Sequence, residues 1–76
     1  MLRLRVKELA QQQGISQGRL ARKADVDIKT LARIYKNPYA EVSSITIEKL
    51  ARALSVSIAD LIEEVDNEVD ENGITT

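Results

Sequence analysis

Three cations spaced along one short segment are the residues of this chain best suited to chemistry. Lys29, Arg33 and Lys36 recur at i, i+4 and i+7, a spacing that puts them on one side of a helix. The apolar residues of the same segment follow the i, i+3, i+4 spacing of a buried helix face: Leu31, Ile34 and Tyr35. A helix divided in this way can donate hydrogen bonds from its cations to base edges in the major groove of double-stranded DNA.

The chain offers few residues for catalysis or metal binding. It has no cysteine and no histidine, so the commonest metal ligands and the commonest general base are missing. It contains no nucleophile motif and no glycine-rich phosphate loop. Because Tyr35 and Tyr39 are its only aromatic residues, it also lacks the stacking platform of many single-strand binders. We therefore expect no enzymatic activity, no catalytic residue, no metal site and no cofactor.

The charges are divided between the two halves of the sequence. Residues 1–39 contain nine Lys and Arg against three Asp and Glu, a formal charge of +6. Residues 40–76 contain two against nine, a formal charge of −7, so the net charge of −1 hides the division. One interpretation is that these charges only solvate the surface. The basic segment favours the other, in which the positive half contacts a polyanion.

Length and hydropathy predict one small cytoplasmic domain. A chain of 76 residues suffices for one domain and at most a tail. No apolar run approaches the roughly 20 residues of a membrane span. The first residues, MLRLRVKEL, lack the continuous apolar core of a signal peptide. We expect no membrane contact.

Five amphipathic segments predict an all-α fold, and their short connections predict a compact bundle of crossing helices. The predicted helices span about Leu4–Gln13, Gln17–Ala24, Ile28–Lys36, Ile45–Leu54 and Ile58–Glu64. Residues that favour helix ends mark their boundaries: Gly14 after the first, and as N-caps Ser16, Asp27, Ser43 or Ser44, and Ser57. Three starts carry the apolar pair of a hydrophobic staple: Ile15 with Leu20, Val26 with Leu31, and Val56 with Leu61.

An acidic tail, residues 65–76, follows the predicted domain of residues 1–64. The tail has no basic residue and few apolar ones, so we expect it to be disordered. Three roles are open for it. The first is that of an inert solubilising end, the second that of a competitor with DNA for the basic face, and the third that of a binding segment for a partner protein.

The run GISQGRLARKADVDIKTLARI, residues 14–34, resembles the helix-turn-helix of Cro/repressor-type regulators, the XRE family. Ser16-Gln17, Leu20-Ala21 and Val26-Asp27 match the family pattern, and LARALSVSIADLI, residues 50–62, resembles its closing segment. The resemblance covers residues 2–64. It implies a five-helix, lambda-repressor-like DNA-binding domain whose second and third helices form the helix-turn-helix, and which commonly represses transcription.

The sequence departs from the family pattern at three places. Asp25 stands where the family has glycine in the turn, and Asp tolerates the left-handed conformation better than most residues. Asn37 stands where glycine often follows the third helix, and Pro38 biases it towards an extended conformation. Ala10 and Tyr35 replace an Arg and a Glu that many relatives pair. We expect the Tyr35 ring to fill the space facing Ala10, with its hydroxyl reaching water or a polar partner.

By this resemblance, base contacts belong to the exposed N-terminal part of the third helix. Lys29 and Arg33 can donate to guanine, and Thr30 can hydrogen bond or contact a thymine methyl. Ile28 either presses on a thymine methyl or belongs to the core. The alternative for Lys29 and Arg33 is a solvated surface pair.

Phosphate contacts are expected from residues that flank this helix in the fold. They are Ser16, Gln17, Lys36, Asn37, Tyr39, Ser43 and Ser44. Three further cations, Arg19, Arg22 and Lys23, either add long-range attraction or solvate the second helix.

The sequence thus predicts a sequence-specific DNA-binding regulator, acting as a homodimer because one small module makes few contacts. No dimerisation element is evident, since Val65 and Val69 are too few for a zipper. The alternative is a protein-interaction module, such as an antitoxin or adaptor that retains the fold and uses the Ile28 face or the tail. The overall acidity fits this alternative slightly better.

Overall fold

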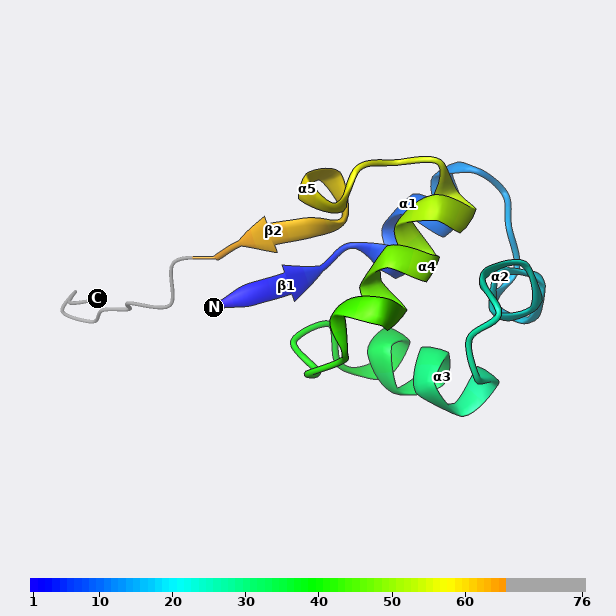
Figure 1. The fold of residues 1–76 in the computed structure, drawn as a ribbon, viewed down its shortest axis with the longest axis horizontal. Coiled ribbons are helices and arrows are strands. Elements are labelled where there is room, and N and C mark those ends of the chain that lie inside the picture. The colour runs from blue at the N-terminus through cyan, green and yellow to red at the C-terminus, as the bar shows by residue number, and fades with distance from the viewer. Residues whose placement is uncertain (66–76) are drawn as a thin grey trace, which may run out of the picture.

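Five helices and a small two-stranded sheet make up the described part of the chain, residues 1–65 of a computed structural model (Figure 1). The elements are β1 (Leu2–Leu4), α1 (Val6–Gln12), α2 (Gln17–Ala24), α3 (Ile28–Lys36), α4 (Ser44–Leu54), α5 (Ile58–Leu61) and β2 (Ile62–Glu64). The prediction of an all-α, five-helix fold is confirmed, with the short sheet as a minor addition that was not predicted. The prediction of a disordered tail falls on residues 66–76, outside the described residues.

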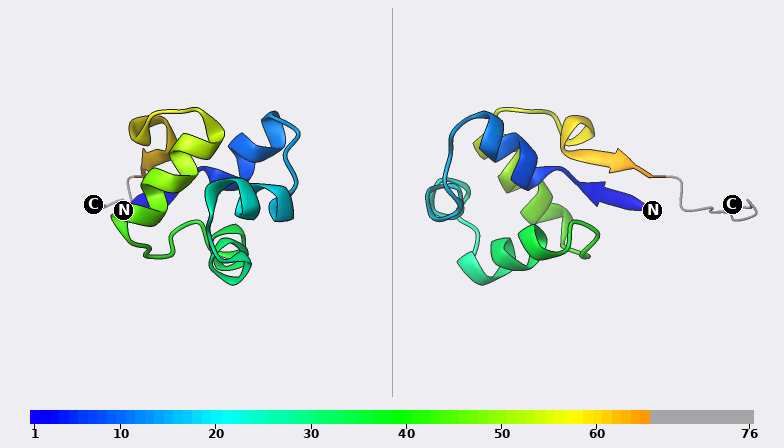
Figure 2. Two further views of the ribbon diagram at one scale, coloured as in Figure 1. Left: turned by 45° about the vertical axis from the view of Figure 1, so that its right-hand side comes forward. Right: turned by 180° about the vertical axis from the view of Figure 1, so that it is seen from behind.

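One core joins all the helices. Its fully buried side chains come from every helix: Val6, Leu20, Leu31, Ile34, Leu50, Leu54 and Leu61. Helix α4 contacts α1, α2 and α5, and α2 packs on α3. The three views agree that the sheet projects from one end of this bundle, while α2 lies at the other end (Figures 1 and 2). In residues 1–65 no helix is both long enough and apolar enough to cross a membrane.

Side chains cap four helices at the positions expected from the sequence. Ser16 Oγ accepts from Arg19 N at 3.3 Å, and Asp27 Oδ1 accepts from Lys29 N at 2.8 Å. Ser43 caps α4, where its Oγ accepts from Thr46 N at 3.2 Å, and Ser57 Oγ accepts from Asp60 N at 3.0 Å. Each bond satisfies one N–H that the first helical turn leaves without a backbone acceptor.

Three residues take the left-handed backbone conformation at helix ends. Gly14 follows α1 with φ 69°, as its type predicts. Asp25 has φ 58° at the end of α2, so the helix-turn-helix turn forms without the family's glycine. Ser55 has φ 56° after α4, which the sequence analysis missed because Ser is not a residue that signals this conformation.

The sheet corrects two predicted helix boundaries. Helix α1 begins at Val6 and not Leu4, and α5 ends at Leu61 and not Glu64. The residues outside these helices pair as antiparallel strands, with Leu2 opposite Glu64 and Leu4 opposite Ile62. Three-residue strands are too short to show the alternation that identifies a strand, and their partners lie at opposite ends of the domain sequence. The sequence signal was therefore absent.

Candidate nucleic-acid interface

Helix α3 divides its side chains between core and solvent. Leu31 and Ile34 are buried, and the cations Lys29, Arg33 and Lys36 are exposed. Asp27 fixes the start of the helix through its bond to Lys29 N. The helix packs on α2 and α1 through its apolar side, so its cationic side faces away from the bundle.

A lysine of α4 braces the turn between α2 and α3. Lys49 Nζ lies 3.2 Å from the carbonyl oxygen of Asp25, to which it donates, and 3.7 Å from the Asp25 carboxylate oxygen Oδ2. The hydrogen bond to the backbone carbonyl is made at Asp25, the residue whose left-handed conformation turns the chain from α2 towards α3. Sequence reasoning missed Lys49, because no local pattern signals a contact across 24 residues.

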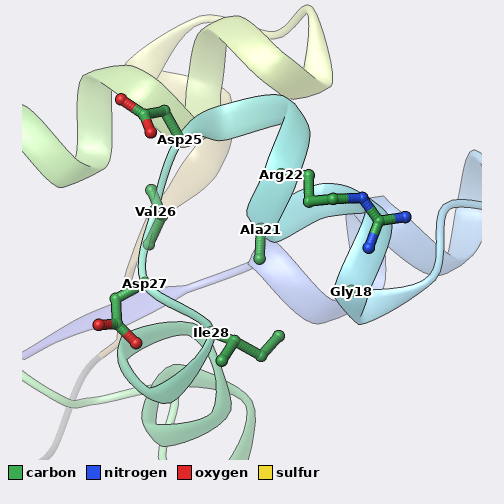
Figure 3. A pocket seen from close by; sticks show the side chains of 7 residues that line it. All are labelled: Gly18, Ala21, Arg22, Asp25, Val26, Asp27 and Ile28. Carbon is green, nitrogen blue, oxygen red and sulfur yellow. The ribbon is translucent and has the colours of Figure 1, made fainter.

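A shallow depression lies beside the turn, on the surface between α2 and α3 (Figure 3). Its lining includes Gly18, Ala21, Arg22 and Ile28. In this view, Arg22 and Ile28 extend to one side of the turn, whereas the carboxylates of Asp25 and Asp27 extend to the other. Ile28 is 46% exposed, so it belongs to the surface and not to the core. Thr30 is half-buried on the same first turn of α3.

Two helix starts carry the serines expected near phosphate. Ser16 and Gln17 stand at the start of α2, and Ser43 and Ser44 at the start of α4. The capping hydroxyls accept one N–H each, which leaves further N–H groups of these first turns without helical acceptors. Free N–H groups at a helix start favour anions.

The loop from α3 to α4 is ordered by its own polar groups. Asn37 is extended, with φ −138° and ψ 96°, as expected before Pro38. Its Oδ1 accepts from Tyr39 N at 3.1 Å, and its carbonyl accepts from Ala40 N at 3.0 Å. The Tyr39 side chain lines a groove with β1. Asn37 and Lys36 are exposed at the C-terminal end of α3.

The cations of the helix-turn-helix have no ionic partner. Within residues 1–65, none of those on α2 and α3 forms an ion pair: Arg19, Arg22, Lys23, Lys29, Arg33 and Lys36. All six are exposed. They create a positive surface on this side of the domain that attracts a polyanion.

Two arginines counted in the positive half of the sequence form ion pairs with glutamates of β2 and α1 instead. Arg3 pairs with Glu63 at 2.6 Å and Glu8 at 3.2 Å, and Arg5 pairs with Glu8 at 3.3 Å. Burial raises the pKa of Glu8, but hydrogen bonds from Arg5 and Arg3 outweigh this effect and hold it below its ordinary value. The hydrogen bond to Glu63 raises the pKa of Arg3 further.

Tyr35 lies against α1 without the polar partner expected for its hydroxyl. Ala10 is fully buried, and the half-buried Tyr35 lines a small cavity with Lys7 and Gln11. The hydroxyl oxygen is buried and bonds to no protein group within residues 1–65. Burial raises the pKa of Tyr35 above its ordinary value, because the charged phenolate is the form that loses solvation.

Comparison with known proteins identifies the family of this domain. The profile of the Cro/C1-type HTH DNA-binding domain matches residues 5–67. The N-terminal DNA-binding domain of SinR from Bacillus subtilis is 33% identical, with a TM-score of 0.70, over 75% of this chain and 83% of that chain. A solution structure of the N-terminal DNA-binding domain of the master biofilm-regulator SinR gives 33% identity and a TM-score of 0.68, over 79% and 87% of the two chains.

A third similar structure is a complex of SinR protein with SinI protein. It also gives 33% identity and a TM-score of 0.70, over 75% of this chain and 55% of that chain. No curated protein sequence matches this chain significantly. The matching family is one of DNA-binding domains and not of enzymes. The chain belongs to the Cro/C1-type helix-turn-helix family of DNA-binding domains.

Proposed function

We propose that this protein is a sequence-specific regulator of transcription that inserts α3 into the major groove of double-stranded DNA. The observation that carries the proposal is the set of exposed, unpaired cations on α3, opposite a side that the core buries. A braced turn holds this helix against α2. Rigid presentation of donors to base edges is what direct readout requires.

The proposed base contacts come from the first two turns of α3. Arg33 donates to guanine through two N–H groups, and Lys29 donates as a point charge. Ile28 offers its exposed side chain to a thymine methyl, beside the depression that Gly18 and Ala21 line. Thr30 contributes a hydroxyl or its methyl group.

The proposed phosphate contacts surround α3. They are Ser16 and Gln17 at the start of α2, Ser43 and Ser44 at the start of α4, and Lys36, Asn37 and Tyr39 after the base-reading turns. Serine hydroxyls and helix-start N–H groups suit phosphate oxygens. Such contacts set the position of the domain on the duplex without reading its sequence.

We further propose that the protein represses transcription, acts in the cytoplasm and binds as a homodimer. A small domain that covers its operator blocks other proteins from the same duplex, which is the simplest route to repression. Two modules on adjacent half-sites supply the contacts that one module lacks.

A duplex-binding titration at several salt concentrations tests the DNA-binding proposal. A pool of random duplexes first selects the preferred site. Affinity for this site should fall steeply with salt, with a log–log slope of about −0.9 for each phosphate neutralised. Lys29→Ala with Arg33→Ala should weaken it at least about tenfold and relax its sequence preference.

The matched control is Lys7→Ala with Arg52→Ala. Both residues are exposed cations outside α2 and α3, so this pair removes the same charge elsewhere on the surface. It should weaken binding much less. An equal loss for both pairs, with both proteins folded, would show that only net charge matters and would contradict the proposed readout by α3.

A protein-interaction module is the second candidate function. The observation that favours it is the similar structure in which SinR protein is in a complex with SinI protein. In this case the chain would bind a partner protein, with its acidic C-terminal residues as one candidate contact. Absence of duplex binding even at low salt would favour this candidate over the first.

A further inference from the structure

An apolar groove lies at the end of the domain that carries the sheet. It has a volume of about 590 Å³. Its lining comes from β1, β2, the loop after α3 and the start of α4, and includes Leu2, Leu4, Tyr39, Val42, Ile47 and Ile62. Leu2 is 55% exposed and Tyr39 is 41% exposed, although both are large and largely apolar. Clustered exposed apolar side chains of this kind mark interaction sites.

The groove lies beside an open sheet edge. Residues Met1 and Arg5 of the N-terminal segment bond through their backbones to Val65 and Leu61. Since backbone groups alternate along an antiparallel ladder, those of Leu2 and Leu4 point to the other edge. Leu4 N donates there to Pro38 O at 2.7 Å. Within residues 1–65 no third strand pairs with β1, so the Leu2 end of this edge is open to another chain.

The scarcity of charge in this groove favours a second copy of this chain as the occupant. A two-fold axis brings each surface patch against itself, so a charged patch would face its own sign. The groove has one ionisable carboxylate in its lining, Glu41, and the ammonium group of Met1 is paired with Glu64 at 3.0 Å. The outer strand β2 instead carries Glu63 and Glu64, which would repel a second β2.

We propose that two copies of this chain associate through this groove, with the Leu2 residues of both copies near the two-fold axis. The interface leaves the helix-turn-helix open, because α2 lies at the end of the domain opposite the sheet (Figure 1). The loop that follows α3 lines the groove. Both α3 helices therefore flank the axis and can face one duplex, a consequence that rests on the proposed DNA-binding function.

Sedimentation equilibrium of the full chain without DNA tests the association. Wild-type protein, measured over concentrations up to about 1 mM so that weak association is visible, should show a monomer–dimer equilibrium. Leu2→Lys should raise its dissociation constant at least about tenfold, because two ammonium groups would meet at the axis. Lys at this position lies opposite Glu64 in the sheet register, so the strand pairing is preserved.

Two further variants keep the test decisive. Leu2→Ala, which only shortens an exposed side chain, should also weaken the dimer and serves if Leu2→Lys fails to fold. Ile58→Lys is the matched control, since Ile58 is 44% exposed but lies on α5 outside the groove. It should dimerise like the wild type.

A monomeric wild type over this range would overturn the proposal, whatever else covers the groove. A dimer that both Leu2 variants leave unchanged would overturn it as well. The Lys29→Ala, Arg33→Ala double variant should lose DNA affinity and still dimerise. Failure of DNA recognition and failure of dimerisation are therefore separate results.

Discussion

At the scale of single residues, short polar side chains fix where α2 and α3 begin and how the chain turns between them. Ser16 and Asp27 cap their helices because a short oxygen-bearing side chain reaches the nearby N–H groups. Asp25 adopts the left-handed turn because its side chain tolerates that backbone better than most. The Lys49 contact to the same residue was unpredictable, because it joins two elements whose packing no local pattern encodes.

Tyr35 gives a prediction at the residue scale. Replacing it by Phe removes a buried hydroxyl without a protein partner, and a buried unsatisfied group costs about 1–3 kcal/mol. Tyr35→Phe should therefore raise the free energy of unfolding by up to about 1 kcal/mol in a urea titration. Tyr39→Phe, at an exposed site, is the control and should leave it unchanged. A loss of more than about 1 kcal/mol in Tyr35→Phe would mean that the hydroxyl has a partner after all.

At the scale of elements, helical periodicity carried most of the prediction. Helices α2 and α3 have the predicted bounds, since apolar spacing and caps agree at their starts. The strands were missed because Leu2–Leu4 and Ile62–Glu64 are stabilised by each other and not by local preference. Because the strands pair, Arg3, which was counted in the basic half of the sequence, forms ion pairs with Glu63 and Glu8.

The ion pairs of Glu8 with Arg3 and Arg5 predict that acid lowers the stability of the fold. Glu8 has a folded pKa below its ordinary value of 4.5, so its stabilising effect is present above that value. The effect is lost as the pH falls through the lower folded pKa, because the carboxylate then binds a proton and releases Arg3 and Arg5. In urea titrations, Glu8→Gln should be less stable than wild type at neutral pH, and this difference should shrink as the pH is lowered step by step below 4.5.

The control for this pH prediction is Glu48→Gln. Glu48 is exposed on α4 and forms no ion pair within the described residues. Its substitution should change stability little at any of these pH values. A constant difference between wild type and Glu8→Gln across the pH range would contradict the role given to the Arg3 and Arg5 contacts.

At the scale of the whole molecule, function depends on how charge and apolar surface are separated. Six free cations lie on α2 and α3, while the apolar groove and the ion pairs of Met1 and Arg3 lie at the sheet. The sequence predicted a positive N-terminal half, but it could not separate the cations that pair from those that stay free. The groove was also beyond prediction, because it arises where strands, loop and helix meet.

This separation predicts a dependence on the spacing of DNA half-sites. A dimer with one α3 on each side of a two-fold axis should bind best to inverted half-sites about one helical turn, or roughly 10 base pairs, apart. Inserting about 5 base pairs turns the second half-site to the opposite side of the duplex. Affinity in a fluorescence titration should then fall to that of a single half-site, since only one module can bind.

The Leu2→Lys variant separates this spacing effect from the recognition of one half-site. Because its cations on α3 are intact, it should bind a single half-site like the wild type. It should also lose most of the advantage of the paired site, and the inserted base pairs should no longer matter to it. If the wild type binds both spacings equally, two independent modules and not a joined pair recognise the DNA, and the groove has another role.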